Sequence, residues 1–92
     1  MKILSSWSIR PGCVKEAVSR YMAGEGAPIA GVTVLGRWYK TDSSIAWAVY
    51  ETDNPALLFE QAAKWADVLD VSHSLVVEDA EIAAGLKRVF GK

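Results

Sequence analysis

The sequence predicts an α+β protein with a ferredoxin-like β-α-β-β-α-β order, a four-stranded antiparallel sheet and an additional C-terminal helix. Three observations support this fold class. Residues 2–10 and 69–78 form two strand-like segments, and residues 31–52 read as a β-hairpin. The intervals between these strands carry apolar residues at helical spacing. With 92 residues, of which 51% are hydrophobic, the chain is expected to form a single domain over residues 1–92.

The first half of the chain begins with a strand over residues 2–10. Its alternation places Ile3, Ser5, Trp7 and Ile9 on one side. Pro11 and Gly12 end the strand, and a helix follows. The apolar stripe of that helix comprises Val14, Ala17, Val18, Tyr21 and Met22. Gly24 is expected to end the helix and to open a loop of mostly small residues up to residue 31.

The second half contains the hairpin, a second helix, a fourth strand and a last helix. Asn54 is expected to cap the second helix and Pro55 to occupy its first turn. The buried stripe of this helix is predicted to be Leu58, Ala62, Trp65 and Ala66. Residues 69–78 form the fourth strand. The last helix spans residues 79–90, with acidic residues in its first turn and basic residues in its last turn, as the helix dipole favours.

The hairpin has the same register whether its turn is Asp42–Ser43 or Thr41–Ser44. The facing pairs are Trp38 with Trp47, Gly36 with Val49, Arg37 with Ala48, and Leu35 with Tyr50. The face with the two tryptophans is the more apolar. We therefore expect it to lie under the helices beside Ile3 and Trp7, with Gly36 allowing a helix to approach closely. All four tryptophans of the chain would then pack between helices and sheet.

The opposite face of the predicted sheet mixes polar and apolar side chains. It would contain Leu4, Ser6, Ser8, Leu35, Arg37, Tyr39, Tyr50, Ser72, Ser74 and Val76. Helices on one side of a four-stranded sheet cannot also cover the other side, and an apolar patch of this size usually marks an interface. The sequence therefore predicts a homodimer in which two sheets face each other around a cavity.

Three segments of the sequence resemble a known family. They are "WSIRPG", "GVTVLGRWYKTDSSIAWAVYETDNPALL" and "WADVLDVSHSLVVEDAEIA", which together cover most of the chain. They resemble the family catalogued as domain of unknown function 3303, whose proteins are similar to the dimeric α/β-barrel superfamily. The resemblance implies a dimer of ferredoxin-like sheets around a cavity. It implies no particular reaction, because that superfamily includes cofactor-free monooxygenases, haem-dependent enzymes, isomerases and stress proteins.

Arg37 is the sharpest candidate for a ligand-binding residue. A guanidinium between two sheets is costly unless it is paired, so it either binds an anionic oxygen of a ligand or pairs with an acidic residue of the partner subunit. Tyr39 and Tyr50 either donate hydroxyl hydrogen bonds to a ligand or pack in the interface. Ser6 and Ser8 would line the cavity, without a His/Asp constellation to activate either as a nucleophile.

His73 is the only histidine and a possible proton carrier, although alternation also favours a buried, hydrogen-bonded structural role. In the superfamily that the sequence resembles, a single histidine can also be a haem ligand. We expect no cofactor and no metal, since no Cys/His cluster has metal-ligand spacing. Cys13 is the single cysteine and has no internal disulfide partner.

The leading functional hypothesis is a homodimeric protein that binds a small anionic or aromatic molecule between its sheets. The alternative is a cofactor-free monooxygenase- or isomerase-like enzyme acting on a small aromatic or unsaturated substrate, with Arg37 polarising an oxygen and a tyrosine or His73 moving a proton. The net charge is −1, and the basic residues are spread along the chain. The sequence therefore has no basic patch that would favour binding to nucleic acid or to an anionic membrane surface. No apolar run approaches the length of a membrane span, and we expect a cytoplasmic protein.

Overall fold

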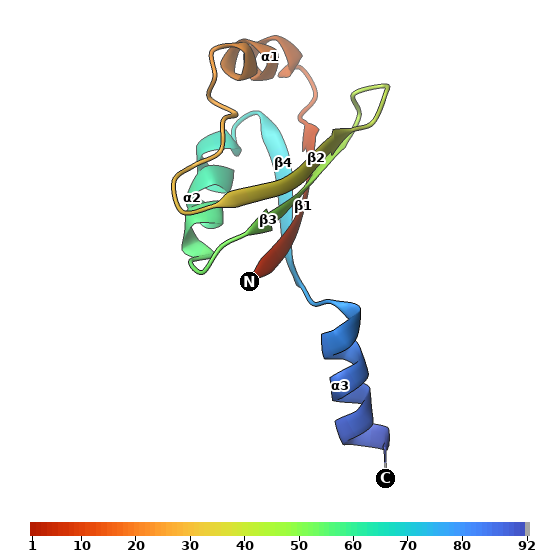
Figure 1. Ribbon diagram of the computed structural model, residues 1–92. Coiled ribbons are helices and arrows are strands. Elements are labelled where there is room, and N and C mark those ends of the chain that lie inside the picture. The colour runs from red at the N-terminus through yellow and green to blue at the C-terminus, as the bar shows by residue number, and fades with distance from the viewer. Residues whose placement is uncertain (92) are drawn as a thin grey trace.

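The computed structural model describes residues 1–91 and has the predicted order of elements (Figure 1). The elements are β1 (Lys2–Ile9), α1 (Val14–Met22), β2 (Thr33–Tyr39), β3 (Ala46–Glu51), α2 (Ala56–Trp65), β4 (Leu69–Val76) and α3 (Asp79–Phe90). The four strands form one antiparallel sheet in the order β2-β3-β1-β4. The α+β, ferredoxin-like fold predicted from the sequence is confirmed.

The hairpin of β2 and β3 has a four-residue turn. The backbone N–H of Lys40 donates to the carbonyl of Ile45 at 2.9 Å, which leaves Thr41–Ser44 as the loop, and Ser43 within it has a φ of 66°. The predicted pairs of Trp38 with Trp47 and of Arg37 with Ala48 are confirmed. Leu35 does not face Tyr50, because an irregularity between Val34 and Gly36 makes Val34 the partner of Tyr50.

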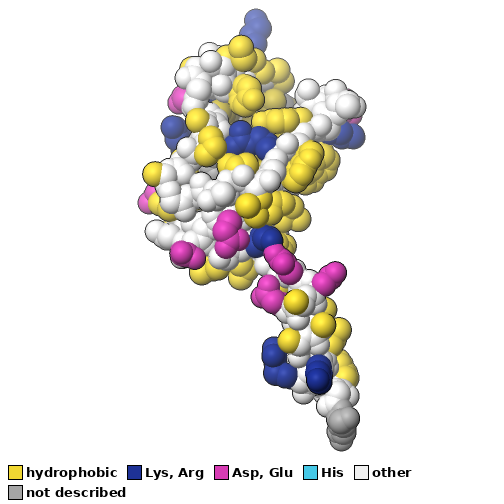
Figure 2. All heavy atoms as spheres, in the orientation of Figure 1, with side chains coloured by type: hydrophobic (Ala, Val, Ile, Leu, Met, Phe, Trp, Pro, Cys, Tyr) yellow, Lys and Arg dark blue, Asp and Glu magenta, His cyan; other side chains and the backbone are white. Residues whose placement is uncertain are grey.

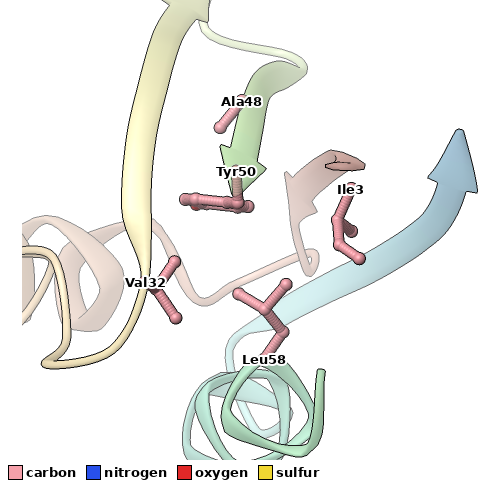
Figure 3. Close-up of a cluster of buried hydrophobic side chains, with 5 residues drawn as sticks. All are labelled: Ile3, Val32, Ala48, Tyr50 and Leu58. Carbon is pink, nitrogen blue, oxygen red and sulfur yellow. The ribbon is translucent and has the colours of Figure 1, made fainter. Parts of the chain in front are cut away.

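The main core lies between the sheet and α2. Leu58 of α2 is 1% exposed and points at the sheet, where it meets Ile3 of β1 and Ala48 and Tyr50 of β3 (Figure 3). Val32, just before β2, closes the same cluster. A second cluster of Ala17, Trp65 and Val68 joins α1 to the end of α2. These clusters place α1 and α2 on one side of the sheet, which we call the covered face; the other side is the open face.

The covered face is not the face of the hairpin that the sequence predicted. Strand β3 pairs with β1 so that Tyr50 lies beside Ile3, Ala48 beside Ser5, and Ala46 beside Trp7. Cross-strand neighbours share a face, so the tyrosine and alanine side of β3 lies under the helices. The predicted register was correct from Gly36 to Tyr39, but the two faces of the hairpin were assigned the wrong way round.

Trp38 and Trp47 consequently lie on the open face, with 56% and 36% of their surfaces exposed. The predicted core position of these two tryptophans is wrong. Gly36 was expected to allow a helix to approach closely, but it makes room for the side chain of Trp38 instead. A Cβ at residue 36 would lie 2.3 Å from Cη2 of Trp38, so the indole ring lies across the glycine. The other two tryptophans, Trp7 and Trp65, do contribute to the covered side.

Helix α1 packs only lightly. Of its predicted stripe, only Ala17 is buried, whereas Val14, Val18, Tyr21 and Met22 are each about half exposed or more. An ion pair holds the helix in place: Arg20 pairs with Asp67, which follows α2, and also with Glu16 one turn earlier. The guanidinium of Arg20 also lies 5.7 Å from the centre of the Trp65 ring.

Helix α3 extends away from the rest of the chain (Figure 1). None of its residues is buried, and hydrophobic side chains lie exposed along it (Figure 2). The radius of gyration is 16.0 Å, compared with about 12 Å for a compact chain of this length. Within residues 1–91, no helix combines the length and the apolar character needed to cross a membrane.

Candidate functional site

A pocket of about 440 Å³ lies between the covered face of the sheet and helices α1 and α2. Its volume is in the range of small-molecule sites in proteins. All four strands contribute to its floor, and both helices contribute to its walls. The lining includes Ser5, Trp7, Val18, Tyr21, Arg37, Tyr39, Tyr50, Gln61, Trp65, Val71 and His73. The cavity therefore belongs to a single chain, on the side opposite to the one that the sequence predicted.

One row of four residues crosses the sheet at the floor of the pocket, and three of them, Arg37, Ser5 and His73, line it. Arg37 of β2 pairs with Ala48 of β3, Ala48 with Ser5 of β1, and Ser5 with His73 of β4. Ala48 and Ser5 are 0% and 1% exposed, and their side chains are small. Ser5 lines the pocket, whereas Ala48 packs in the core cluster with Leu58, and the long polar side chains stand at the two ends of the row.

Arg37 carries a charge that the described part of the chain does not neutralise. Its Nε is buried and has no hydrogen-bond partner among residues 1–91. No aspartate or glutamate appears among the residues that line the pocket. By contrast, Arg10 and Arg20 each form an ion pair with an aspartate at the surface. Burying a guanidinium nitrogen without a hydrogen-bond partner costs free energy.

His73 is held in one orientation and one tautomer. Its Nε2 lies 3.2 Å from the carbonyl oxygen of Leu58, and a carbonyl only accepts, so Nε2 carries a proton. Burial lowers the pKa of His73, against a smaller opposing effect of that hydrogen bond. The ring is therefore neutral near pH 7, and its Nδ1 is an acceptor. That atom is buried and has no hydrogen-bond partner within residues 1–91.

Aromatic rings form one side of the pocket. The rings of Trp7 and Tyr39 lie edge to face with centres 6.2 Å apart, and Tyr21 of α1 meets Tyr39 at 6.4 Å in the same way. Burial raises the pKa of Tyr39, and the neighbouring Tyr21 adds to this effect while the charge of Arg37 opposes it. Tyr39 is thus a neutral phenol beside a cation, and it offers a hydroxyl group and a flat apolar surface.

The structure brings together four of the six residues predicted for the site. Arg37, Tyr39, Tyr50 and the possible proton carrier His73 all line the pocket. Ser6 and Ser8 do not, because Ser6 pairs with Trp47 and Ser72 on the open face and Ser8 has the same parity along β1. A ligand contact by any of these residues stays a prediction.

Sequence reasoning missed Ser5, which lies in the centre of the pocket floor. Its signal was present, since it alternates with Ile3 and Trp7 on the side expected under the helices. A pocket on that side was not anticipated, so a serine there was not considered a site residue. Tyr21, Gln61 and Trp65 were missed because they belong to helices whose distance from the sheet does not follow from periodicity.

The polar groups of the pocket differ in hydrogen-bonding character. Residues 1–91 contain no group of three or more His, Cys, Asp or Glu side chains placed to hold a metal. The polar groups of the pocket are instead one cationic donor, one neutral imidazole acceptor, the hydroxyl groups of tyrosine and serine, and the amide of Gln61. Such a set can fix the orientation of a mostly apolar molecule that carries a few oxygen atoms.

Two comparisons with known proteins bear on identity. No curated protein matches the chain. A family model described as a domain of unknown function (DUF3303) matches residues 1–90, and this range includes every strand and helix and all residues of the pocket. The chain therefore belongs to the family described as domain of unknown function (DUF3303).

Proposed function

We propose that this protein binds a small, mostly apolar molecule with an anionic oxygen in the pocket between the sheet and helices α1 and α2. The observation that carries the proposal is the buried Nε of Arg37, which has no hydrogen-bond partner among the described residues. The pocket supplies no carboxylate to neutralise it. A ligand carboxylate or enolate would satisfy both the charge and the hydrogen bond.

The rest of the pocket fits the apolar part of such a molecule. Trp7, Tyr39 and Trp65 offer ring faces and edges, and Ser5 and Ala46 line the floor with small side chains. A volume of about 440 Å³ accommodates an aromatic ring with a short side chain. This differs from the location expected from the sequence, because the proposed cavity lies within one chain and not between two sheets.

The experiment that tests this proposal is a thermal shift titration with benzoate and cinnamate. Ligands that bind only the folded state raise the melting temperature. We expect at least one of these acids to raise it for the natural sequence and not for Arg37→Leu. The matched control is Lys15→Leu, which removes the same charge from an exposed position on α1 outside the pocket lining. Failure of every small aromatic acid to bind, or unchanged binding by Arg37→Leu, would refute the proposal.

A second candidate function is proton transfer at the same site, as in a cofactor-free isomerase. The observation that favours it is the unpartnered Nδ1 of His73, a neutral base whose tautomer is fixed by Leu58. His73 would remove a proton from a carbon next to a carbonyl, the C–H electron pair would form the enolate, and Arg37 would stabilise its negative oxygen. In a β,γ-unsaturated substrate the enolate is conjugated with the double bond, so return of the proton to the γ carbon would shift the double bond and complete an isomerisation.

Proton exchange measures this second function directly. Phenylpyruvate in deuterated buffer should exchange the protons next to its carbonyl faster with the protein than without it, as followed by proton NMR. His73→Leu should abolish the acceleration, and Lys15→Leu should keep it. A protein that binds aromatic acids but does not accelerate exchange would be a binding protein and not an isomerase of this kind.

We also propose that the protein is a homodimer, as in the dimeric α/β-barrel superfamily to which its sequence is similar, with the open face of the sheet covered by the same face of a second copy. The centre of this face carries Leu4, Ser6, Gly36, Trp38, Trp47 and Val49. Its charged residues stand at the strand ends, where Lys2 pairs with Glu78 and Arg10 with Asp70. An uncharged, aromatic centre with a charged rim is typical of a protein interface.

Sedimentation equilibrium at micromolar concentration tests the dimer. The natural sequence should have twice the chain mass, and Trp47→Lys should have the mass of one chain, because a lysine in the centre of two facing sheets would be buried without a partner. Phe59→Lys is the control, since Phe59 is 73% exposed on α2, away from the open face. A stable monomer of the natural sequence would refute the dimer but would leave the ligand proposal intact.

A cytoplasmic location is proposed as well, supported by the free thiol of Cys13.

A further inference from the structure

We infer that the ligand of this pocket carries a hydroxyl group, or another hydrogen-bond donor, at the end opposite to its anionic oxygen. The inference rests on the proposed function, because it uses the same pocket and the same role of Arg37. It narrows the ligand class from small aromatic acids to hydroxylated aromatic acids. The observation that carries it is independent of Arg37: it is the second unpartnered buried atom of the pocket, Nδ1 of His73.

Nδ1 of His73 can accept a hydrogen bond but cannot donate one, so its partner must be a hydrogen-bond donor. The other ring nitrogen donates to the carbonyl of Leu58, so the neutral ring has only a lone pair at Nδ1. A carboxylate cannot satisfy this atom, because it also has only lone pairs. A hydroxyl group can. The two unpartnered atoms of the pocket therefore have opposite hydrogen-bonding character, and a ligand that satisfies both must offer an acceptor to one and a donor to the other.

The sheet fixes how these two atoms are arranged. Arg37 and His73 stand on the two edge strands, β2 and β4, at the ends of one row across the sheet. Three strand spacings separate their backbones, which amounts to about 14 Å. Both side chains line the pocket, as does Ser5 of β1 between them. A flat molecule lying across this floor would meet the guanidinium at one end and the imidazole at the other.

The side chains beside the row from Arg37 to His73 favour an aromatic group in the middle of the ligand. Trp7 and Tyr39 flank one side of the row, and Tyr50 lies on the other, next to Ala48. These side chains pack well against an aromatic ring and provide no further charge. An aromatic ring with an acid group at one position and a hydroxyl group across the ring matches this order of acceptor, apolar surface and donor. A sugar or a phosphate ester would place polar groups against the aromatic wall.

Matched ligand pairs test the inference in the natural protein. We expect 4-hydroxycinnamate to bind about tenfold more tightly than 4-methylcinnamate in isothermal titration, because the methyl group has a similar size but leaves Nδ1 of His73 unpaired. In His73→Leu the preference for the hydroxyl should disappear, while binding of 4-methylcinnamate should remain. Equal binding of the two acids by the natural protein would overturn the inference and leave the proposed function standing. A hydroxyl preference that persists in His73→Leu would overturn it as well.

A spectroscopic readout keeps the test independent of whether His73→Leu folds. The chain has one histidine, so a long-range ¹H–¹⁵N spectrum reports on His73 alone. The free protein should show a protonated Nε2 and an unprotonated Nδ1. Addition of 4-hydroxycinnamate should move the Nδ1 resonance upfield, and 4-methylcinnamate should leave it in place. A protonated Nδ1 in the free protein, or the same shift with both acids, would overturn the inference. Failure of both acids to bind would instead count against the proposed function.

Discussion

The two faces of the sheet differ in what they carry and in what covers them. The open face presents large apolar side chains, with Trp38 and Trp47 as cross-strand neighbours. The covered face presents alanine, serine, tyrosine, arginine and histidine beneath two helices. A ranking of the two faces by hydrophobicity alone would place the open face under the helices and leave the covered face outside.

The difference shows that the covered face is built around a cavity as well as a core. At the Tyr50 end of the sheet, Leu58 fills the space between helix and strands, and this part is tightly packed. Beside this part, the pocket is lined by the small side chains of Ser5 and Ala46 and by Arg37 and His73 of the two edge strands, and the helices do not fill it. Small residues and polar edge residues are favourable at a site that a ligand occupies. A close-packed core at the same place would need large apolar side chains, such as the tryptophans, to fill the space.

The largest expected effect on stability comes from the packed end of the covered face. Leu58→Ala should lower the free energy of unfolding by about 3 kcal/mol, since it removes a side chain that is 1% exposed and leaves a cavity among Ile3 and Tyr50. Phe59→Ala, one residue away, should cost less than about 0.5 kcal/mol, because Phe59 is 73% exposed. Urea denaturation measures both. Similar losses for the two variants would mean that α2 does not face the sheet as described.

A smaller effect is expected from the polar end of the same face on acidification. The pKa of His73 is lowered by burial in the folded state, so below about pH 6.5 the unfolded chain binds a proton more readily than the folded one. Stability should therefore decrease as the pH falls through the folded-state pKa. The melting temperature of the natural sequence should fall more between about pH 7 and pH 5 than that of His73→Leu. A steeper fall in the variant would show that His73 is charged in the folded protein.

The smallest effect on stability should come from the open face. In Gly36→Ala the new Cβ would meet the Trp38 ring at 2.3 Å, and in a single chain the ring can turn away because it is 56% exposed. We expect a loss of less than about 1 kcal/mol together with a clear change in tryptophan fluorescence. Gly12→Ala is a control for a glycine without neighbours, although its φ of 80° adds backbone strain of its own. An unchanged emission spectrum would contradict the stacking of Trp38 on Gly36.

The candidate site was partly predictable from residue types. Arg37 was recognised because a fixed charge stands between Gly36 and Trp38 in an otherwise apolar strand. His73 was recognised because it is the only histidine of the chain. Ser6 and Ser8 were misassigned, whereas Ser5 was overlooked, because the choice among them depends on the side of the sheet that holds the pocket. The pocket lies on the covered side because α1 and α2 stand far enough from the strands to leave a cavity between them.

The sequence by itself determined the order of the elements, the register of the hairpin from Gly36 to Tyr39 and the alternation along β1 and β4. These follow from local periodicity and turn chemistry, which act between residues close in the chain. Only the tertiary structure decided which face of the hairpin lies under the helices, because this depends on how β3 pairs with β1 across 39 to 49 residues of chain. Both faces of the hairpin are apolar enough to be buried, so its own sequence does not distinguish them. The pairing with Ile3, Ser5 and Trp7 does, and it places Arg37 and His73 at the two ends of one pocket floor.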